Sequence, residues 1–202
     1  MSGIPYVIEK GRNDQEHSYD LYSRLLKDRI IFVRGEFCQE MADSIVAQLL
    51  FLESSDSEEE IRMYISSPGG EVNSMYAIYD VMTYVKSSIS TIAIGTCASA
   101  ASFILASGEK GKRFALPNVD IMVHELSGGT GGKFNDIKNH FEHTTKLYDK
   151  MAAHYSEFTG QKLSKIKTDM QKDYFMTSEE AKTYGLIDEV LYRRKSNGKN
   201  LQ

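Results

Sequence analysis

The sequence is poor in cysteine and has no long apolar run, which argues against a disulfide-rich secreted protein and against a membrane-spanning one. It contains no tryptophan, three prolines and two cysteines, Cys38 and Cys97, in 202 residues. Two thiols in a chain of this length form no disulfide framework, so we expect a reducing, cytoplasmic environment. No apolar run approaches the length of a membrane span, and the first residues lack the basic region and apolar run of a signal peptide. We therefore expect neither a signal peptide nor a membrane partner.

The chain also lacks the basic excess of a nucleic-acid-binding protein. Lys and Arg number 24 against 28 Asp and Glu, and the net charge is −4. The basic cluster Arg193-Arg194-Lys195 lies in a polar C-terminal segment, 193–202, which we expect to be a flexible, solvated tail. With 41% hydrophobic and 26% charged residues, the composition is that of a globular chain. The length favours one domain over 1–202.

Strand-like and helix-like segments alternate along the chain. Apolar runs predict strands at 30–33, 61–65, 89–94 and 119–123 and a short extended segment at 114–117, and helical spacing predicts helices at 39–53, 72–85 and 100–106. This alternation is typical of an α/β protein built from βαβ units around a mostly parallel sheet. In such sheets, ligands bind at the carboxyl ends of the strands.

Three of these strand ends carry residues that could take part in catalysis. Ser99 lies in a run of small residues between a predicted strand and a predicted helix, His124 follows strand 119–123, and Gly69-Gly70 follow Pro68. A nucleophilic serine needs a base, for which histidine is the usual choice. The base needs an orienting carboxylate. Spacing leaves four carboxylates open for that part: Asp136, Asp149, Asp169 and Asp173.

A serine that attacks a carbonyl group also needs backbone N–H groups for the oxyanion that forms, and Gly70 and Ala100 are the candidates. Each of these features has a plainer interpretation. Ser99 could be a helix N-cap, which is far commoner, and His124 could be a strand-end histidine bonded to a backbone carbonyl. Gly69-Gly70 could form an ordinary turn.

Three other patterns predict no function. Segment 127–134 nearly matches a phosphate-binding loop but lacks its first glycine, and Phe134 replaces the residue that would hold Mg²⁺, so we expect no nucleotide cofactor. His140, His143 and His154 share helix faces without paired carboxylates, so we expect surface histidines and no metal. Cys97 is an improbable nucleophile beside Ser99.

A long helix is predicted after a glycine-rich stretch. Eight positions recur in steps of three and four, which gives a seam with a period of 3.5, and seven of the eight are apolar. They are Phe134, Ile137, Phe141, Thr144, Tyr148, Met151, Tyr155 and Phe158. Gly160 ends the pattern. About 25 helical residues span roughly 37 Å, more than one compact domain covers. The pattern therefore favours packing on another subunit over packing on its own core.

Taken together, these segments resemble the ClpP family, the proteolytic subunit of ATP-dependent Clp proteases. The resemblance covers almost the whole chain. It is carried by Ser67-Pro68-Gly69-Gly70, Ala98-Ser99, Met122-Val123-His124 and segments 19–31, 77–80, 108–117, 173–175 and 179–188.

The resemblance implies a crotonase-like α/β fold with a protruding long helix, and a serine endopeptidase. The nucleophile would be Ser99, the base His124 and the acid Asp173. The oxyanion would be held by the N–H groups of Gly70 and Ala100. The resemblance implies no cofactor, since the family itself binds no ATP.

The resemblance also implies an assembly, a tetradecamer of two stacked seven-membered rings around a closed chamber. An AAA+ Clp ATPase would supply unfolded polypeptides, and residues 1–18 would form an axial segment. Residues expected to lie along the substrate as a strand are Gly128, Gly129, Thr130 and Gly131. Residues expected to form the docking pockets for the unfoldase are Tyr64, Tyr84, Ile92, Ile94, Phe114, Leu116 and Leu191, for which ordinary core is the alternative.

The chain departs from the family pattern at Gln171-Lys172, where an Asp-Arg pair that links the rings is common, at Ala100, where methionine is usual, and at Glu125-Leu126. Two other functions stay open. One is a non-catalytic or weakly active ring subunit that needs a paralogous partner. The other is crotonase-type acyl-CoA chemistry, which needs no serine nucleophile.

Overall fold

The computed structural model describes residues 4–10 and 15–192. Its strands are β1 (Tyr6–Lys10), β2 (Glu16–Asp20), β3 (Ile30–Arg34), β4 (Ile61–Ser67), β5 (Ile89–Ala98), β6 (Arg113–Ala115), β7 (Asp120–Val123), β8 (Tyr174–Met176) and β9 (Glu189–Val190). Its helices are α1 (Leu21–Lys27), α2 (Gln39–Ser55), α3 (Val72–Tyr84), α4 (Ala100–Ala106), α5 (Phe134–Thr159), α6 (Leu163–Asp169) and α7 (Ser178–Tyr184).

A seven-stranded, mostly parallel sheet organises the fold, and β5 divides it into two branches. Along the main path the order is β3-β4-β5-β6-β9, with parallel pairing throughout. The first half of the ten-residue β5 pairs with β6, and its second half, from Thr96 to Ala98, pairs with β7. Gly95 lies between the halves with a φ of 67°, a conformation that favours glycine. Ser99 therefore follows directly on the branch that β5 shares with β7.

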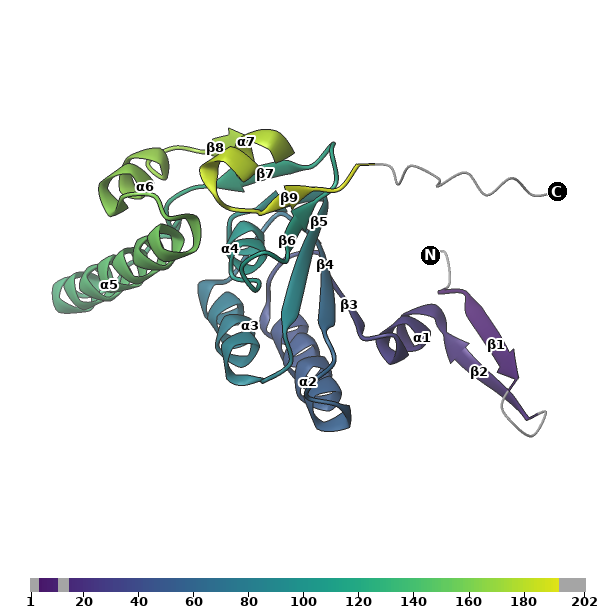
Figure 1. Cartoon of the computed structure of the whole chain (residues 1–202). Helices are drawn as coiled ribbons and strands as arrows, with labels where there is room; N and C mark the ends of the chain where they lie inside the picture. The colour runs from purple at the N-terminus through teal and green to yellow at the C-terminus, as the bar shows by residue number, and fades with distance from the viewer. Residues whose placement is uncertain (1–3, 11–14, 193–202) are drawn as a thin grey trace.

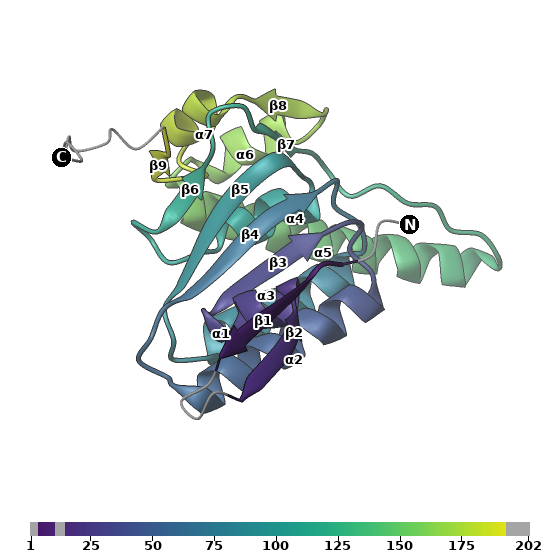
Figure 2. The same ribbon diagram turned by 90° about the vertical axis from the view of Figure 1, so that its right-hand side faces the viewer.

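Helices α2, α3 and α4 cover one face of this sheet (Figure 2). Alternate residues of each strand point to that face, so Ile31 and Val33 of β3 and Met63 and Ile65 of β4 are fully buried. Helix α4 is buried along its whole length. The small alanine side chains of α4 allow the helix to lie close to the sheet. Ala100, which begins the helix next to Ser99, therefore has little freedom to move.

Two elements extend away from this body (Figure 1). Helix α5 is buried only near its C-terminal end, at Met151, Ala152 and Tyr155, while Phe134 at its tip is 79% exposed. It ends at Gly160, whose φ of 72° is the left-handed conformation of a C-cap. On the other side of the sheet, β1 and β2 form an antiparallel hairpin.

An ion pair between a buried arginine and a half-buried aspartate joins the C-terminal elements to the sheet. The Arg113 guanidinium on β6 donates to both carboxylate oxygens of Asp188, at 2.6 and 2.9 Å, and to the carbonyl of Phe158 at 2.9 Å. Burial raises the pKa of Asp188, but the hydrogen bonds from Arg113 outweigh it and hold that pKa below its usual value. This arginine therefore ties the end of α5 and the loop before β9 to one strand.

The α/β architecture and the parallel sheet confirm the fold class predicted from the sequence. The predicted helices agree with α2, α3, α4 and α5, and strand 89–94 continues to Ala98. The sequence analysis did not predict α1, α6, α7, the hairpin strands β1 and β2, or the short strands β8 and β9. The predicted tail, 193–202, lies outside the described residues. In residues 4–10 and 15–192, no helix is long and apolar enough to cross a membrane.

Candidate active site

Ser99 occupies a strained turn between β5 and α4. Its φ of 56° and ψ of −122° put a non-glycine residue in a left-handed region, at a cost of about 1–3 kcal/mol. The turn is held because the Ser99 N–H donates to the Met122 carbonyl at 2.9 Å and the Ser99 carbonyl accepts from the Phe103 N–H at 3.1 Å. Ser99 stands at the N-cap position of α4, but its hydroxyl does not cap the helix. The N-cap position predicted by the plainer interpretation is therefore correct, but the hydroxyl is not used as a cap and is free for another partner.

The Ser99 hydroxyl instead meets an imidazole. His124 Nε2 lies 2.9 Å from Ser99 Oγ, and His124 Nδ1 lies 3.1 Å from Asp173 Oδ1. This geometry suits the tautomer in which Nδ1–H donates to the carboxylate and Nε2 accepts from the serine hydroxyl. The imidazole is half-buried, whereas the Asp173 side chain is 60% exposed.

Strand pairing explains why this particular aspartate reaches the histidine. Strands β7 and β8 are antiparallel with Val123 opposite Tyr174, so the residue that follows β7 meets the residue that precedes β8. Those residues are His124 and Asp173.

The other acids that spacing left open are placed differently. Asp149 pairs with Lys167 at 2.6 Å, and Asp169 pairs with Lys165 at 2.6 Å. Asp136 lies in the exposed first turn of α5.

Gly69 and Gly70 pack so closely that neither position could hold a side chain. A Cβ on Gly69 would lie 2.6 Å from the Ser99 Cβ, and one on Gly70 would overlap the Phe37 carbonyl. The Gly69 N–H donates to Ser67 Oγ at 3.0 Å. Within the described residues, the N–H groups of Gly70 and Ala100 have no acceptor. Two free donors beside a serine could bind the oxyanion of a tetrahedral intermediate.

A small pocket opens at this site, lined by Ser99 and His124 together with Gly70, Leu126, Met151 and Tyr155. It continues into an apolar groove of about 500 Å³ between segment 126–130 and α5. Gly128, Gly129 and Thr130 line that groove, and no atom would meet a side chain added at Gly128 or Gly129. The backbone here is accessible to an extended ligand; that residues 128–131 lie along a substrate stays a prediction.

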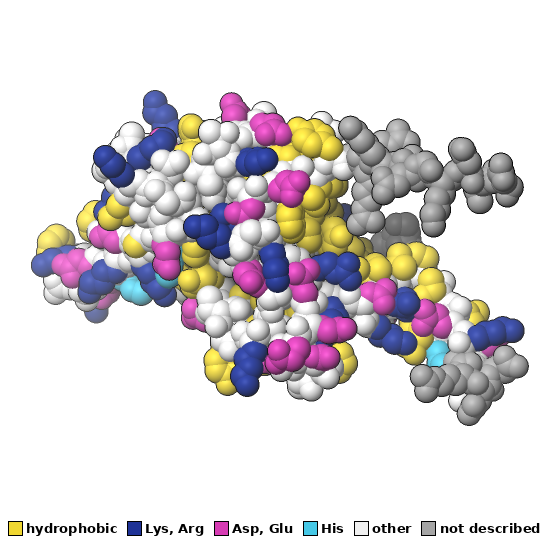
Figure 3. Space-filling view, in the orientation of Figure 1, with side chains coloured by type: hydrophobic (Ala, Val, Ile, Leu, Met, Phe, Trp, Pro, Cys, Tyr) yellow, Lys and Arg dark blue, Asp and Glu magenta, His cyan; other side chains and the backbone are white. Residues whose placement is uncertain are grey.

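Three of the seven residues predicted to form docking pockets share a row across the sheet. Tyr64, Ile92 and Phe114 are register partners on β4, β5 and β6. Ile92 is buried, with 5% exposed, which fits ordinary core, whereas Tyr84 is 80% and Leu116 41% exposed. Ile94 and Leu191 are half-buried, as are Tyr64 and Phe114. Figure 3 shows hydrophobic side chains gathered along the side of the sheet that faces the hairpin. Docking at this surface stays a prediction.

The remaining candidates from the sequence are a second nucleophile, Cys97, a metal site and the histidines of α5. The Cys97 thiol is fully buried, and burial raises its pKa far above the usual value, so it is a poor nucleophile. No group of three or more metal-ligating side chains occurs in the described part of the chain. The prediction that His154 is a surface histidine is wrong: its half-buried ring lies 5.0 Å from Tyr79 and 5.8 Å from Phe158. Burial lowers its pKa.

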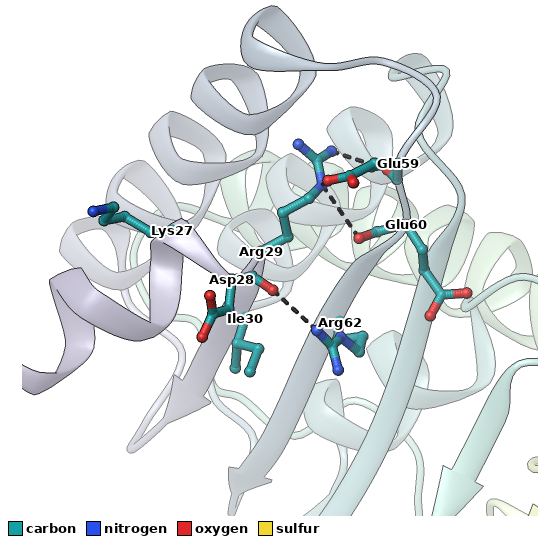
Figure 4. Close-up of a pocket in the computed structure, with 7 residues that line it drawn as sticks. All are labelled: Lys27, Asp28, Arg29, Ile30, Glu59, Glu60 and Arg62. Atoms are coloured by element: carbon teal, nitrogen blue, oxygen red, sulfur yellow. Dashed lines mark hydrogen bonds and ion pairs between the residues drawn. The ribbon is translucent and has the colours of Figure 1, made fainter. Parts of the chain in front are cut away.

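A larger hollow, of about 700 Å³, lies at the opposite ends of the strands (Figure 4). It is lined by charged side chains, and its arginines are engaged by the main chain. Arg29 donates to the carbonyls of Glu59 and Glu60, and Arg62 donates to the carbonyl of Asp28. These contacts stabilise the strand starts, and no serine or histidine lines this hollow.

Sequence reasoning did not single out two residues that contact the Ser99 turn. Ser102 Oγ donates to the Ser99 carbonyl at 2.8 Å, and Tyr155 Oη lies 2.8 Å from Ser102 Oγ. Tyr155 came forward only as one apolar position of the long helix. A tyrosine hydroxyl gives no periodic signal, so only the structure could place it at the turn.

A comparison with known families matches most of the chain. The matching family model is described as Clp protease and spans residues 13–194. The matched segment contains Ser99, His124, Asp173 and both glycines of the turn after β4.

Proposed function

The chain belongs to the Clp protease family, and from this premise we propose that it is a serine endopeptidase of the ClpP type, which hydrolyses peptide bonds through an acyl-enzyme on Ser99. The observation that carries the proposal is the hydrogen-bonded series Ser99–His124–Asp173. It joins a hydroxyl, a base and an orienting carboxylate from three separate segments, which is the arrangement that nucleophilic serine catalysis requires.

The chemistry follows from this geometry. Ser99 Oγ attacks the peptide carbonyl while His124 Nε2 takes its proton, and Asp173 stabilises the imidazolium that forms. His124 then gives the proton to the leaving amine, and the peptide C–N bond breaks. Water, activated by the same imidazole, hydrolyses the acyl-enzyme and restores the serine hydroxyl. The N–H groups of Gly70 and Ala100 bind the oxyanion in both halves of the reaction.

The assembly is part of the proposal. We expect a tetradecamer of two stacked heptameric rings, in the cytoplasm, with the triads inside a closed chamber. Phe134 and Phe141, near the N-terminal tip of α5, are 79% and 71% exposed, and exposed apolar side chains grouped in this way support a contact between rings. An AAA+ Clp ATPase would dock on the row through Tyr64 and supply unfolded polypeptides. Segment 128–131 would bind them as a strand.

Hydrolysis of a short fluorogenic peptide by the purified chain tests this function. We expect the wild type to turn over and Ser99→Ala to lose at least about 10⁴-fold in rate. Ser107→Ala, at the end of the same helix, is the matched control and should keep full activity. Substantial turnover by Ser99→Ala would contradict the assignment. A silent wild type that gains activity only with a paralogous subunit carrying its own serine would support the scaffolding alternative.

A further inference from the structure

The Ala100 N–H belongs to the same peptide unit as the Ser99 carbonyl. A peptide unit is planar, and in the trans form its N–H and C=O point in opposite directions. Whatever fixes the Ser99 carbonyl oxygen therefore fixes the direction of the Ala100 N–H. That N–H is one of the two proposed oxyanion donors, and its aim decides how well it stabilises the intermediate.

Three groups gather at the Ser99 carbonyl oxygen. The Phe103 N–H donates to it at 3.1 Å, as the first hydrogen bond of α4. Ser102 Oγ donates at 2.8 Å, and Tyr155 Oη lies 3.4 Å away. The first contact is common to any helix start, whereas the two hydroxyls are additions made by side chains.

The two hydroxyls form a directed chain. Ser102 and Tyr155 each have one hydroxyl proton, and both oxygens lie within reach of the Ser99 carbonyl oxygen, at 2.8 and 3.4 Å. We assign the Ser102 proton to that carbonyl because its contact is the shorter, and the Tyr155 proton to Ser102 Oγ, 2.8 Å away. Tyr155 therefore donates to Ser102, which donates to Ser99. Hydrogen bonds in series polarise one another, so the bond from Tyr155 strengthens the bond from Ser102 to the Ser99 carbonyl. The peptide unit is then more polarised, which makes the Ala100 N–H a better donor.

Both side chains are held in place and shielded from water. Ser102 and Tyr155 are buried, and burial raises the pKa of the tyrosine so that its hydroxyl keeps its proton. The Tyr155 ring packs edge-on against Phe103, with 5.4 Å between ring centroids. Water cannot replace either hydroxyl in this setting, so removing one hydroxyl interrupts the series of hydrogen bonds from Tyr155 to the Ser99 carbonyl.

We propose that Tyr155 and Ser102 are positioning residues of the oxyanion site, which fix the plane of the Ser99–Ala100 peptide and so aim the Ala100 N–H. The proposal rests on the proposed peptidase function. It also gives α5 a role in the site, because Tyr155 reaches the nucleophile turn from that helix.

The test is Tyr155→Phe, which removes the hydroxyl and keeps the ring. One lost hydrogen bond acting on the transition state should lower kcat about fivefold to tenfold and leave KM unchanged. Inhibition by a peptide boronic acid, which forms a tetrahedral adduct on the serine, should weaken by the same factor. Ser102→Ala should behave in the same way. The double variant should lose no more than the larger single loss, because the two hydroxyls act in one chain.

Tyr76→Phe is the matched control. Tyr76 is also buried and also packs against Phe103, at 5.6 Å, but its hydroxyl has no partner within the described residues. We expect its kcat, KM and boronate affinity to equal those of the wild type.

Each outcome separates this inference from the proposed function. A wild type that neither hydrolyses peptides nor binds the boronate overturns the function, and this inference falls with it. An active wild type whose kcat and boronate affinity survive Tyr155→Phe and Ser102→Ala overturns the inference alone. So does a rise in KM at constant kcat, because the Tyr155 hydroxyl would then act in substrate binding and not on the oxyanion donor. If Tyr155→Phe does not fold, Ser102→Ala decides by the same criteria.

Discussion

Replacing Gly69 by alanine tests how the Ser99 turn is held. The backbone of Gly69 lies against that turn, and a Cβ there would be 2.6 Å from the Ser99 Cβ and 2.8 Å from the Ala98 carbonyl oxygen. Carbon atoms in contact are usually about 3.5–4.0 Å apart, so the turn must move by about 1 Å. Neither neighbour is a flexible side chain that could swing away.

The structure sets the size of the effect. A displacement of about 1 Å at a catalytic group can cost about 10²-fold in rate, so we expect Gly69→Ala to lower kcat/KM at least that much. Gly69 also has a φ of 99°, which an alanine adopts only with about 1–3 kcal/mol of strain. The variant should therefore lose both activity and stability.

Gly111→Ala separates these two losses. Gly111 has a φ of 91°, similar to that of Gly69, but a Cβ there would meet no atom within 4 Å. It carries the backbone strain without the contact. Peptide hydrolysis and thermal unfolding should be measured for both variants, and Gly111→Ala should lose stability while its kcat/KM stays that of the wild type.

Two results would refute this reasoning. One is a Gly69→Ala variant that folds and keeps kcat/KM within about twofold of the wild type, since the turn would then tolerate the contact. The other is an equal loss of activity in Gly111→Ala, since backbone strain alone would then explain the effect.

Three further predictions follow from the triad, the core ion pair and the long helix. Asp173→Asn should lower kcat about 10⁴-fold on the same peptide, because the imidazole loses its orienting carboxylate; a loss below about tenfold would contradict that role. Asp188→Asn should cost about 3 kcal/mol in denaturant unfolding, because Arg113 keeps a buried charge without its counterion. The pKa of Asp188 is lower in the folded protein than in the unfolded chain. The stability that the ion pair contributes is therefore present at pH values above the pKa of the unfolded chain, and it is lost as the pH falls through the pKa of the folded protein. Wild type should therefore lose more stability than Asp188→Asn below about pH 4, and parallel acid curves would contradict this. Phe141→Asp should shift the particle mass in sedimentation toward single rings without changing the helix content, whereas an unchanged mass would remove the tip of α5 from the contact.

The sheet and the long helix could be predicted because their patterns are long. Strand β4 alternates buried and accessible residues over seven positions, and α5 carries an apolar repeat over 26 residues. Strands β8 and β9 are three and two residues long, too short to show any alternation. The pairing of β7 with β8 was therefore invisible in the sequence. That pairing selects Asp173 among four acids, so spacing alone could not make the choice.

The fine structure of the site depends on contacts that no local pattern records. Gly70 could be interpreted as a turn glycine, yet its close approach is to Phe37, far away in the sequence. Tyr155 and His154 are neighbours on α5 and both looked like ordinary helix residues. Tyr155 reaches Ser102 and His154 packs against Phe103, because α5 packs against α4. Which residues of two helices meet is decided by their tertiary packing.

Covalent labelling by a fluorophosphonate probe tests the central claim most directly. Such a reagent reacts with an activated serine, so digestion and mass spectrometry of the labelled chain should place the adduct on Ser99. His124→Ala should abolish the adduct, because the hydroxyl then has no base. An adduct on another residue, or no adduct on a chain that still hydrolyses peptides, would contradict the account of Ser99 as the nucleophile.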